Sequence, residues 1–238
     1  MHTGDVDYAA GDASLRGYLA FEDRGVKRPG LLVFHEGLGL GDFAMERARR
    51  LAERGYVAFA ADMFGERRQA ADLQQAMTLI GHLRTNPATL RARARAALAT
   101  LTALPEVDAT RCAAIGFCFG GTVVLELARD GADLKAVVSF HGVLSTTQPA
   151  AAGAVRASVL VLTGADDPLA PSDQVAAFEN EMRTAKVADW QVISYGNTLH
   201  GFANPAADGS IMKAALYDAR ADRRSWAAMQ GLFDEVLV

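Results

Sequence analysis

The stretch IGFCFGG, residues 115–121, lies between an apolar segment that ends at Ile115 and an amphipathic segment that begins at Phe119. Glycines at 116 and 120 flank Cys118, and a strand that turns into a helix within a few atoms needs small residues on both sides. The residue between them is held in a strained backbone conformation. The first amides of the helix point at Cys118 and favour its thiolate. The stretch therefore predicts a strand–turn–helix unit that presents a nucleophilic cysteine.

A buried structural cysteine beside a tight turn is the alternative interpretation of Cys118, because free cysteine is among the most buried residue types. Cys112 fits that description better, since it lies inside the preceding strand and no glycine flanks it. We assign Cys112 no role. The two cysteines could pair only in an oxidising compartment. We expect a reduced protein that is cytoplasmic.

Outward from this unit, short apolar segments alternate with helical patterns along the chain, which is typical of βαβ units and a parallel sheet. We expect one α/β domain over residues 1–238, with a mostly parallel twisted sheet and helices on both faces. The expected strands are an antiparallel hairpin of 6–8 and 15–21, then 29–34, 56–61, 111–115, 136–140, 158–163 and 190–195. The expected helices are 43–54, about 68–83, 88–104, 119–129, 171–184 and about 212–236, and the arginines of the run RARARAALATL are expected to form a solvated face.

Two loops further along the chain carry an acid and a histidine, the partners that a nucleophile requires. GADDPLAP, residues 164–171, and GNTLHGF, residues 196–202, each follow an expected strand. Both therefore lie at carboxyl ends of strands, where open parallel sheets bind their ligands. The order of nucleophile, acid and histidine is that of α/β-hydrolases. We predict that Cys118, Asp167 and His200 are catalytic.

His200 has four competitors among the histidines. His2 lies at the terminus, and His82 lies in the helical middle region. His35 and His141 each follow an expected strand, so both are candidates to line a substrate pocket. None of the four follows the acid-bearing loop, and the chain order selects His200.

The acid is one of two adjacent aspartates. Pro168 after Asp167, and the turn that ends at Pro171, favour Asp167 as the residue that points inward. Asp166 then serves as a turn residue, a common role of aspartate in such sequences.

With these motifs in place, the chain resembles the dienelactone hydrolase family, from about residue 30 to the last helix. The resemblance rests on His35-Glu36-Gly37, GFCFGG, GADDPLAP and LHGFANP. It implies an α/β-hydrolase fold and a catalytic role for Glu36, which hydrogen-bonds the resting thiol and assists its deprotonation. It also implies that the backbone amides of Gly37 and Phe119 form the oxyanion hole. A plain ion-pairing role is the alternative for Glu36.

One position departs from the family pattern. Members that hydrolyse dienelactone hold the substrate carboxylate with two arginines, one of them four residues after the catalytic histidine, and here that position is Asn204. The second arginine comes from the middle region, where the candidates are Arg67, Arg68 and Arg84. The departure puts dienelactone itself in doubt as a substrate. The expected pocket residues are His35, His141, Phe202 and Asn204.

The overall composition narrows the range of partners. A net charge of −4 with mixed signs gives no basic footprint for nucleic acid. No apolar run is long enough to span a membrane. No metal-binding HExxH and no GxGxxG phosphate loop occurs, so we expect neither a metal nor a cofactor. The chain is expected to be a monomer or a weak homodimer, with its last helix docked on its own sheet.

These observations predict an enzyme that hydrolyses a small-molecule ester or lactone through a Cys-His-Asp triad and an acyl-enzyme. The alternative from another class is a non-catalytic ligand-binding protein of the same fold. Against it stands the complete set of Glu36, Cys118, Asp167 and His200. A thiol redox enzyme that uses Cys118 and Cys112 is a second alternative, and the expected burial of Cys112 argues against it.

Overall fold

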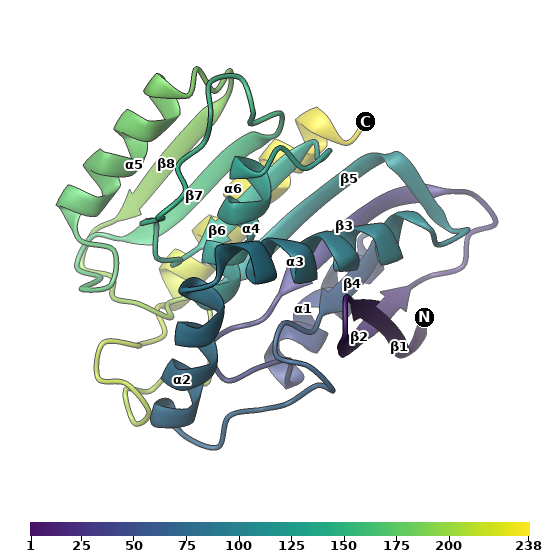
Figure 1. Cartoon of the computed structure of the whole chain (residues 1–238), viewed down its shortest axis with the longest axis horizontal. Coiled ribbons are helices and arrows are strands. Elements are labelled where there is room, and N and C mark those ends of the chain that lie inside the picture. The colour runs from purple at the N-terminus through teal and green to yellow at the C-terminus, as the bar shows by residue number, and fades with distance from the viewer.

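The computed structural model describes residues 1–238 as one eight-stranded sheet with helices on both faces (Figure 1). The strands run in the order β1-β2-β4-β3-β5-β6-β7-β8, and β2 alone is antiparallel to its two neighbours, β1 and β4. The strands are β1 (His2–Ala10), β2 (Ala13–Phe21), β3 (Arg28–Phe34), β4 (Val57–Ala61), β5 (Val107–Phe117), β6 (Ala136–Phe140), β7 (Ser158–Gly164) and β8 (Trp190–Tyr195). The helices are α1 (Asp42–Glu53), α2 (Leu73–Arg84), α3 (Pro87–Thr102), α4 (Phe119–Arg129), α5 (Ser172–Thr184) and α6 (Ala219–Val236). The predicted α/β architecture is confirmed.

Two apolar cores cover the two faces of the sheet. Residues of α1 and α6 form one core with β3–β7, and residues of α3, α4 and α5 form the other. The central strands are buried on both faces and are almost wholly apolar, as a doubly covered parallel sheet requires. On α6, Met229 and Phe233 are fully buried, so the terminal helix docks on its own sheet as expected. None of the helices combines the length and apolar character that a membrane span requires.

Two predicted helices begin later than expected. The predicted start of α2 near residue 68 is wrong, because the helix begins at Leu73 after Asp72, whose carboxylate accepts a hydrogen bond from the amide of Gln75. The predicted start of α6 near residue 212 is also wrong. Asp218 caps that helix through the amides of Arg220 and Ala221, which satisfies two donors that have no intrahelical acceptor. Residues 205–217 thus form a loop that lies beside α2 (Figure 1).

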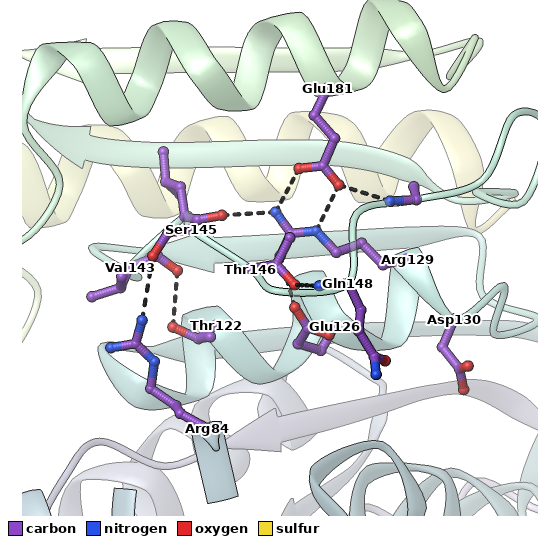
Figure 2. Close-up of polar contacts among 12 residues, drawn as sticks. Arg84, Thr122, Glu126, Arg129, Asp130, Val143, Ser145, Thr146, Gln148 and Glu181 are labelled. Carbon is purple, nitrogen blue, oxygen red and sulfur yellow. Dashed lines mark hydrogen bonds and ion pairs between the residues drawn. The ribbon is translucent and has the colours of Figure 1, made fainter. Parts of the chain in front are cut away.

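Ion pairs join the helices on the α4 face, and those of Arg129 are buried. Arg129 of α4 donates 2.9 and 2.8 Å hydrogen bonds to Glu181 of α5, and its Nη1 donates a 3.1 Å hydrogen bond to Glu126 (Figure 2). Arg91 of α3 also donates to Glu126, and Arg95 donates to Asp130. The expectation that the arginines of α3 form a merely solvated face is therefore wrong. Arg91 and Arg95 pair with acidic residues at α4, and Arg93 donates a 2.6 Å hydrogen bond to the carbonyl of Met63. The periodicity of α3 alone does not contain these tertiary contacts.

Candidate active site

Cys118 occupies a tight turn between β5 and α4. Its backbone has φ 53° and ψ −113°, a conformation that side chains other than glycine rarely adopt. A Cβ on Gly116 would lie 1.9 Å from the carbonyl oxygen of Gly120, and one on Gly120 would lie 2.2 Å from that of Phe34. Both glycines are therefore required by close backbone contacts. As the first residue of α4, Phe119 has a backbone N–H without an intrahelical acceptor.

The end of β3 packs directly against this turn. The amide of Gly120 donates a 3.0 Å hydrogen bond to the carbonyl of His35, which places Glu36 and Gly37 beside Cys118. The ring of His35 is buried and joins two backbone segments: Nδ1 donates to the carbonyl of Glu36 at 2.6 Å, and Nε2 accepts from the amide of Met63 at 3.2 Å. Burial lowers the pKa of His35, so the ring is neutral. His35 holds the backbone here and does not line the cavity.

Asp167 and His200 meet where β7 and β8 end. Oδ2 of Asp167 lies 2.8 Å from Nδ1 of His200, and Oδ1 accepts a 2.8 Å hydrogen bond from the amide of Leu169. Asp167 is 2% exposed, whereas Asp166 is exposed to solvent. A Cβ on Gly164 would lie 2.3 Å from the carbonyl oxygen of Thr198, so the two loops touch through their backbones. The turn directs Asp167 inward, which agrees with the sequence-based choice between the aspartates.

The charge state of His200 follows from its neighbours. Burial disfavours the imidazolium, but Cys118 and the hydrogen-bonded Asp167 outweigh burial and raise the pKa of His200 to about 10. Nδ1 therefore donates to the Asp167 carboxylate, and Nε2 carries the second proton. Nε2 is buried and has no hydrogen-bond partner. The ring can thus deliver a proton from Nε2 to a group bound in the cavity that it lines.

One cavity of about 490 Å³ joins these elements. Cys118 and His200 both line it, together with Gly37, Phe119 and Glu36. The amide of Gly37 has no acceptor within the protein, like that of Phe119. Most of the remaining lining residues are apolar and come from α2 and from the loop before α6. A thiol, an imidazole and two free backbone amides thus share one largely apolar cavity.

Glu36 is hydrogen-bonded to Asn204 and not to the thiol. Oε2 accepts a 2.5 Å hydrogen bond from Nδ2 of Asn204, and no hydrogen bond joins Glu36 to Cys118, in contrast to the expectation from the family resemblance. Burial raises the pKa of Glu36 to about 7, although the Asn204 amide and His200 oppose the shift. The carboxyl therefore changes charge near neutral pH. Asn204 lines the cavity, as expected.

His141 and Phe202 lie behind the site and do not line the cavity, contrary to expectation. Nδ1 of His141 accepts a 3.1 Å hydrogen bond from the amide of Cys118, and its ring packs edge-on against His200 and Phe202. Burial, and then the charge of His200, hold the pKa of His141 well below its usual value. His141 is thus a neutral support for the turn and for His200.

Only one of the three candidate arginines reaches the cavity. Arg84, at the end of α2, lines it and donates to the hydroxyl of Ser145 at 3.3 Å (Figure 2). Arg67 binds Asp5 and the carbonyl of Gly17, far from Cys118, and Arg68 is exposed outside the cavity. Arg84 stands without a second arginine, because Asn204 occupies the other position.

Arg47 is a site-supporting residue that sequence reasoning missed. It is 2% exposed, lies among the rings of Phe43, Phe117 and Trp226, and donates a 2.6 Å hydrogen bond to the carbonyl of Ala203, three residues after His200. The sequence contained one signal for Arg47, namely a charged residue on the otherwise apolar face of α1. No cluster of three or more His, Cys, Asp or Glu side chains is arranged to hold a metal ion.

The dienelactone hydrolase family model matches residues 15–237. The solved structure of m3DLH is 47% identical, with a TM-score of 0.94, and the match covers 100% of this chain and 99% of that one. A dienelactone hydrolase-like promiscuous phosphotriesterase, P91 from metagenomic libraries, is 45% identical with a TM-score of 0.93 over 100% of this chain and 99% of its own. An uncharacterized protein of Caenorhabditis elegans is 38% identical over 141 residues, 58% of this chain and 89% of the relative. Since the family match spans nearly the whole chain, the protein belongs to the dienelactone hydrolase family of α/β-hydrolases.

Proposed function

We propose that this hydrolase cleaves an ester or lactone of a small molecule through a thioester formed on Cys118. The observation that carries the proposal is the single cavity lined by Cys118 and by His200, whose second ring nitrogen is bonded to the buried Asp167. A nucleophile, a proton-transfer group and an orienting acid are the components of covalent acyl transfer. Membership of the dienelactone hydrolase family supports the same reaction class.

In the first step, Sγ of Cys118 bonds to the substrate carbonyl carbon, and the bond to the alcohol oxygen breaks. His200 gives its Nε2 proton to the departing oxygen. In the second step, water attacks the thioester while His200 accepts its proton. The carbon–sulfur bond then breaks, which releases the acid and restores the thiolate. The protonated state of His200, with its pKa of about 10, suits its role as the proton donor in the first step.

The amides of Gly37 and Phe119 are the proposed donors to the oxyanion that develops on the carbonyl oxygen. One such donor contributes roughly 3–4 kcal/mol to transition-state stabilisation. Glu36 is proposed to accept the proton of the resting Cys118 thiol once, before the first step, because the second step restores the thiolate for later turnovers. Because its carboxyl is bonded to Asn204, Glu36 must exchange that partner for the thiol before it can act.

A panel of aryl esters, assayed before and after alkylation with iodoacetamide, tests the proposal. We expect measurable turnover that alkylation abolishes. A non-catalytic ligand-binding protein would bind the esters without turnover. A thiol redox enzyme would instead reduce a disulfide probe and would need Cys112, which is 1% exposed and whose pKa burial raises to about 11.

Phosphotriester hydrolysis is a second candidate activity, since a relative that is 45% identical is a promiscuous phosphotriesterase. A neutral phosphotriester, like an ester, presents an electrophilic centre and an oxygen that the two amides can stabilise. Release of nitrophenol from a dialkyl nitrophenyl phosphate would test it, with the Cys118→Ala variant as the control. Turnover that persists in that variant would contradict this second activity at the proposed site.

A further inference from the structure

Apolar side chains from two separate segments border the outer part of the cavity. Leu73, Met77 and Ile80 come from α2, and Ile211 and Met212 come from the loop before α6. We call these five residues the apolar rim. The two segments lie beside each other at the end of the sheet where the strand carboxyl ends meet (Figure 1). The rim continues without interruption into the cavity that Cys118 and His200 line.

Three side chains of the rim are exposed to solvent, although large apolar side chains are usually buried. Met77 is 57% exposed, Ile211 is 56% exposed and Leu73 is 37% exposed. Leu216 and Tyr217, on the same loop as Ile211, are also exposed, and the other large exposed apolar residues are Met1, Val26 and Val238. An exposed apolar patch at the entrance of a cavity is typical of a ligand-binding site.

The loop half of the rim is fixed to the segment that carries His200. The amide of Leu216 donates to the carbonyl of His200 at 2.9 Å, and the amide of Tyr217 donates to that of Ala207 at 2.8 Å. The amide of Ala215 donates to the carbonyl of Met212 at 2.8 Å. These hydrogen bonds hold the rim in position before a substrate arrives, which reduces the entropic cost of binding.

We propose that the apolar rim binds the larger apolar group of a neutral ester, an alkyl or aryl acyl chain whose carbonyl carbon lies at Cys118. The occupant is a substrate group rather than a protein partner, because the rim leads into the cavity that contains the nucleophile. Methionines at 77 and 212 are adaptable side chains that suit acyl groups of different shapes. This inference rests on the proposed ester hydrolysis and specifies its substrate class.

The test compares nitrophenyl acetate, butyrate and octanoate. We expect kcat/KM to rise with acyl length, since each added methylene leaves water for the rim. In the double variant Met77→Ser/Ile211→Ser, the ratio of octanoate to acetate kcat/KM should fall about tenfold, the discrimination that one or two methylenes provide in an apolar pocket. Val26→Ser is the matched control, since Val26 is 66% exposed and lies outside the cavity. It should leave the ratio unchanged.

A flat chain-length profile in the wild type, or an unchanged ratio in the double variant, would overturn the inference. A wild-type dimer that becomes monomeric in the double variant, with equal losses on acetate and octanoate, would assign the rim to a subunit interface instead. Titration of Cys118→Ala with methyl acetate and methyl octanoate gives a readout independent of turnover. If no ester is hydrolysed, the proposed function fails, and tighter binding of the octanoate by this variant would still support the rim.

Discussion

Oδ2 of Asp167 lies 2.8 Å from Nδ1 of His200, although 33 residues separate them in the sequence. Two adjacent parallel strands, β7 and β8, end at this point, and the backbones of the following loops touch at Gly164 and Thr198. Asp166, the immediate neighbour of Asp167, is exposed and its amide bonds the carbonyl of Thr198. The pairing therefore depends on which of two adjacent aspartates the turn directs inward.

Asp167→Asn should lower kcat by several orders of magnitude, because loss of the orienting acid in a comparable triad costs about 10⁴-fold. The side-chain oxygen of the new asparagine can still accept a hydrogen bond from the amide of Leu169. The uncharged side chain cannot, however, stabilise the protonated ring of His200. Asp166→Asn is the matched control and should change kcat little. Steady-state kinetics on one aryl ester decide the ranking. A larger loss in Asp166→Asn than in Asp167→Asn would reject the assignment of the acid.

The two cysteines should respond oppositely to replacement by alanine. Cys118→Ala removes the proposed nucleophile and should abolish turnover, while the thermal unfolding midpoint stays close to that of the wild type. Cys112→Ala leaves a small void beside Gly30 in the buried strand pair, so it should lower the unfolding midpoint and retain most activity. Unimpaired ester turnover in Cys118→Ala would remove the basis for the covalent mechanism.

The sequence was most informative near Cys118. The bounds of α4, β6 and β8 agree with the prediction, because each element combines a clear period with an abrupt boundary of glycine or polar residues. The requirement for glycine on both sides of Cys118 is a local steric one, so it could be recognised in the sequence. The sheet topology and the chain order alone therefore predicted that Cys118, Asp167 and His200 lie at the same end of the sheet.

Contacts between residues far apart in the chain could not be predicted from the sequence in the same way. Residues 212–217 have an apolar pattern compatible with a helix, but the amide of Leu216 bonds the carbonyl of His200 instead. His35 and His141 follow strands, as pocket residues do, yet each ring bonds a backbone amide. The partner of Glu36 was also missed, since Asn204 was considered only as a contact for substrate. In each case a tertiary hydrogen bond outweighed the local signal.

Glu36→Gln should stabilise the protein increasingly as the pH rises. The pKa of Glu36 is raised by burial to about 7 from 4.5, so the folded protein binds the proton more tightly than the unfolded chain does. Stability therefore falls as the pH rises from about 4.5 to about 7, and the glutamine variant does not show this loss. At about 1.4 kcal/mol per pKa unit, the gain above pH 7 is on the order of 2 kcal/mol, because partial exposure reduces the full value.

Urea unfolding of wild type and Glu36→Gln at pH 5 and pH 8 measures this difference. Glu53→Gln on the exposed side of α1 is the control and should show no comparable dependence. Turnover of Glu36→Gln should fall even as stability rises, if the carboxyl assists deprotonation of Cys118. A stability gain that is equal at both pH values would contradict the burial argument.

Asn204 should make the site favour neutral substrates over anionic ones. Its amide donates to Glu36 and carries no charge, whereas an arginine could hold a substrate carboxylate through two parallel hydrogen bonds. Arg84 lines the same cavity, but its guanidinium is bonded to the hydroxyl of Ser145 and is exposed to water, which screens its charge. An anionic substrate would thus leave water with little compensation, next to a carboxyl at Glu36 that ionises near neutral pH.

The measurement is kcat/KM for a neutral lactone and for a carboxylated lactone of matched size. The wild type should accept the neutral compound at least as well as the anionic one. Asn204→Arg should shift the preference toward the anion by about tenfold or more, because a charge-assisted hydrogen bond contributes about 1.5–3 kcal/mol. Asn204→Gln, which keeps the amide and adds no charge, should not produce this shift. A wild type that strongly prefers the anion, or an Asn204→Arg variant with unchanged preference, would show that another residue determines charge selectivity.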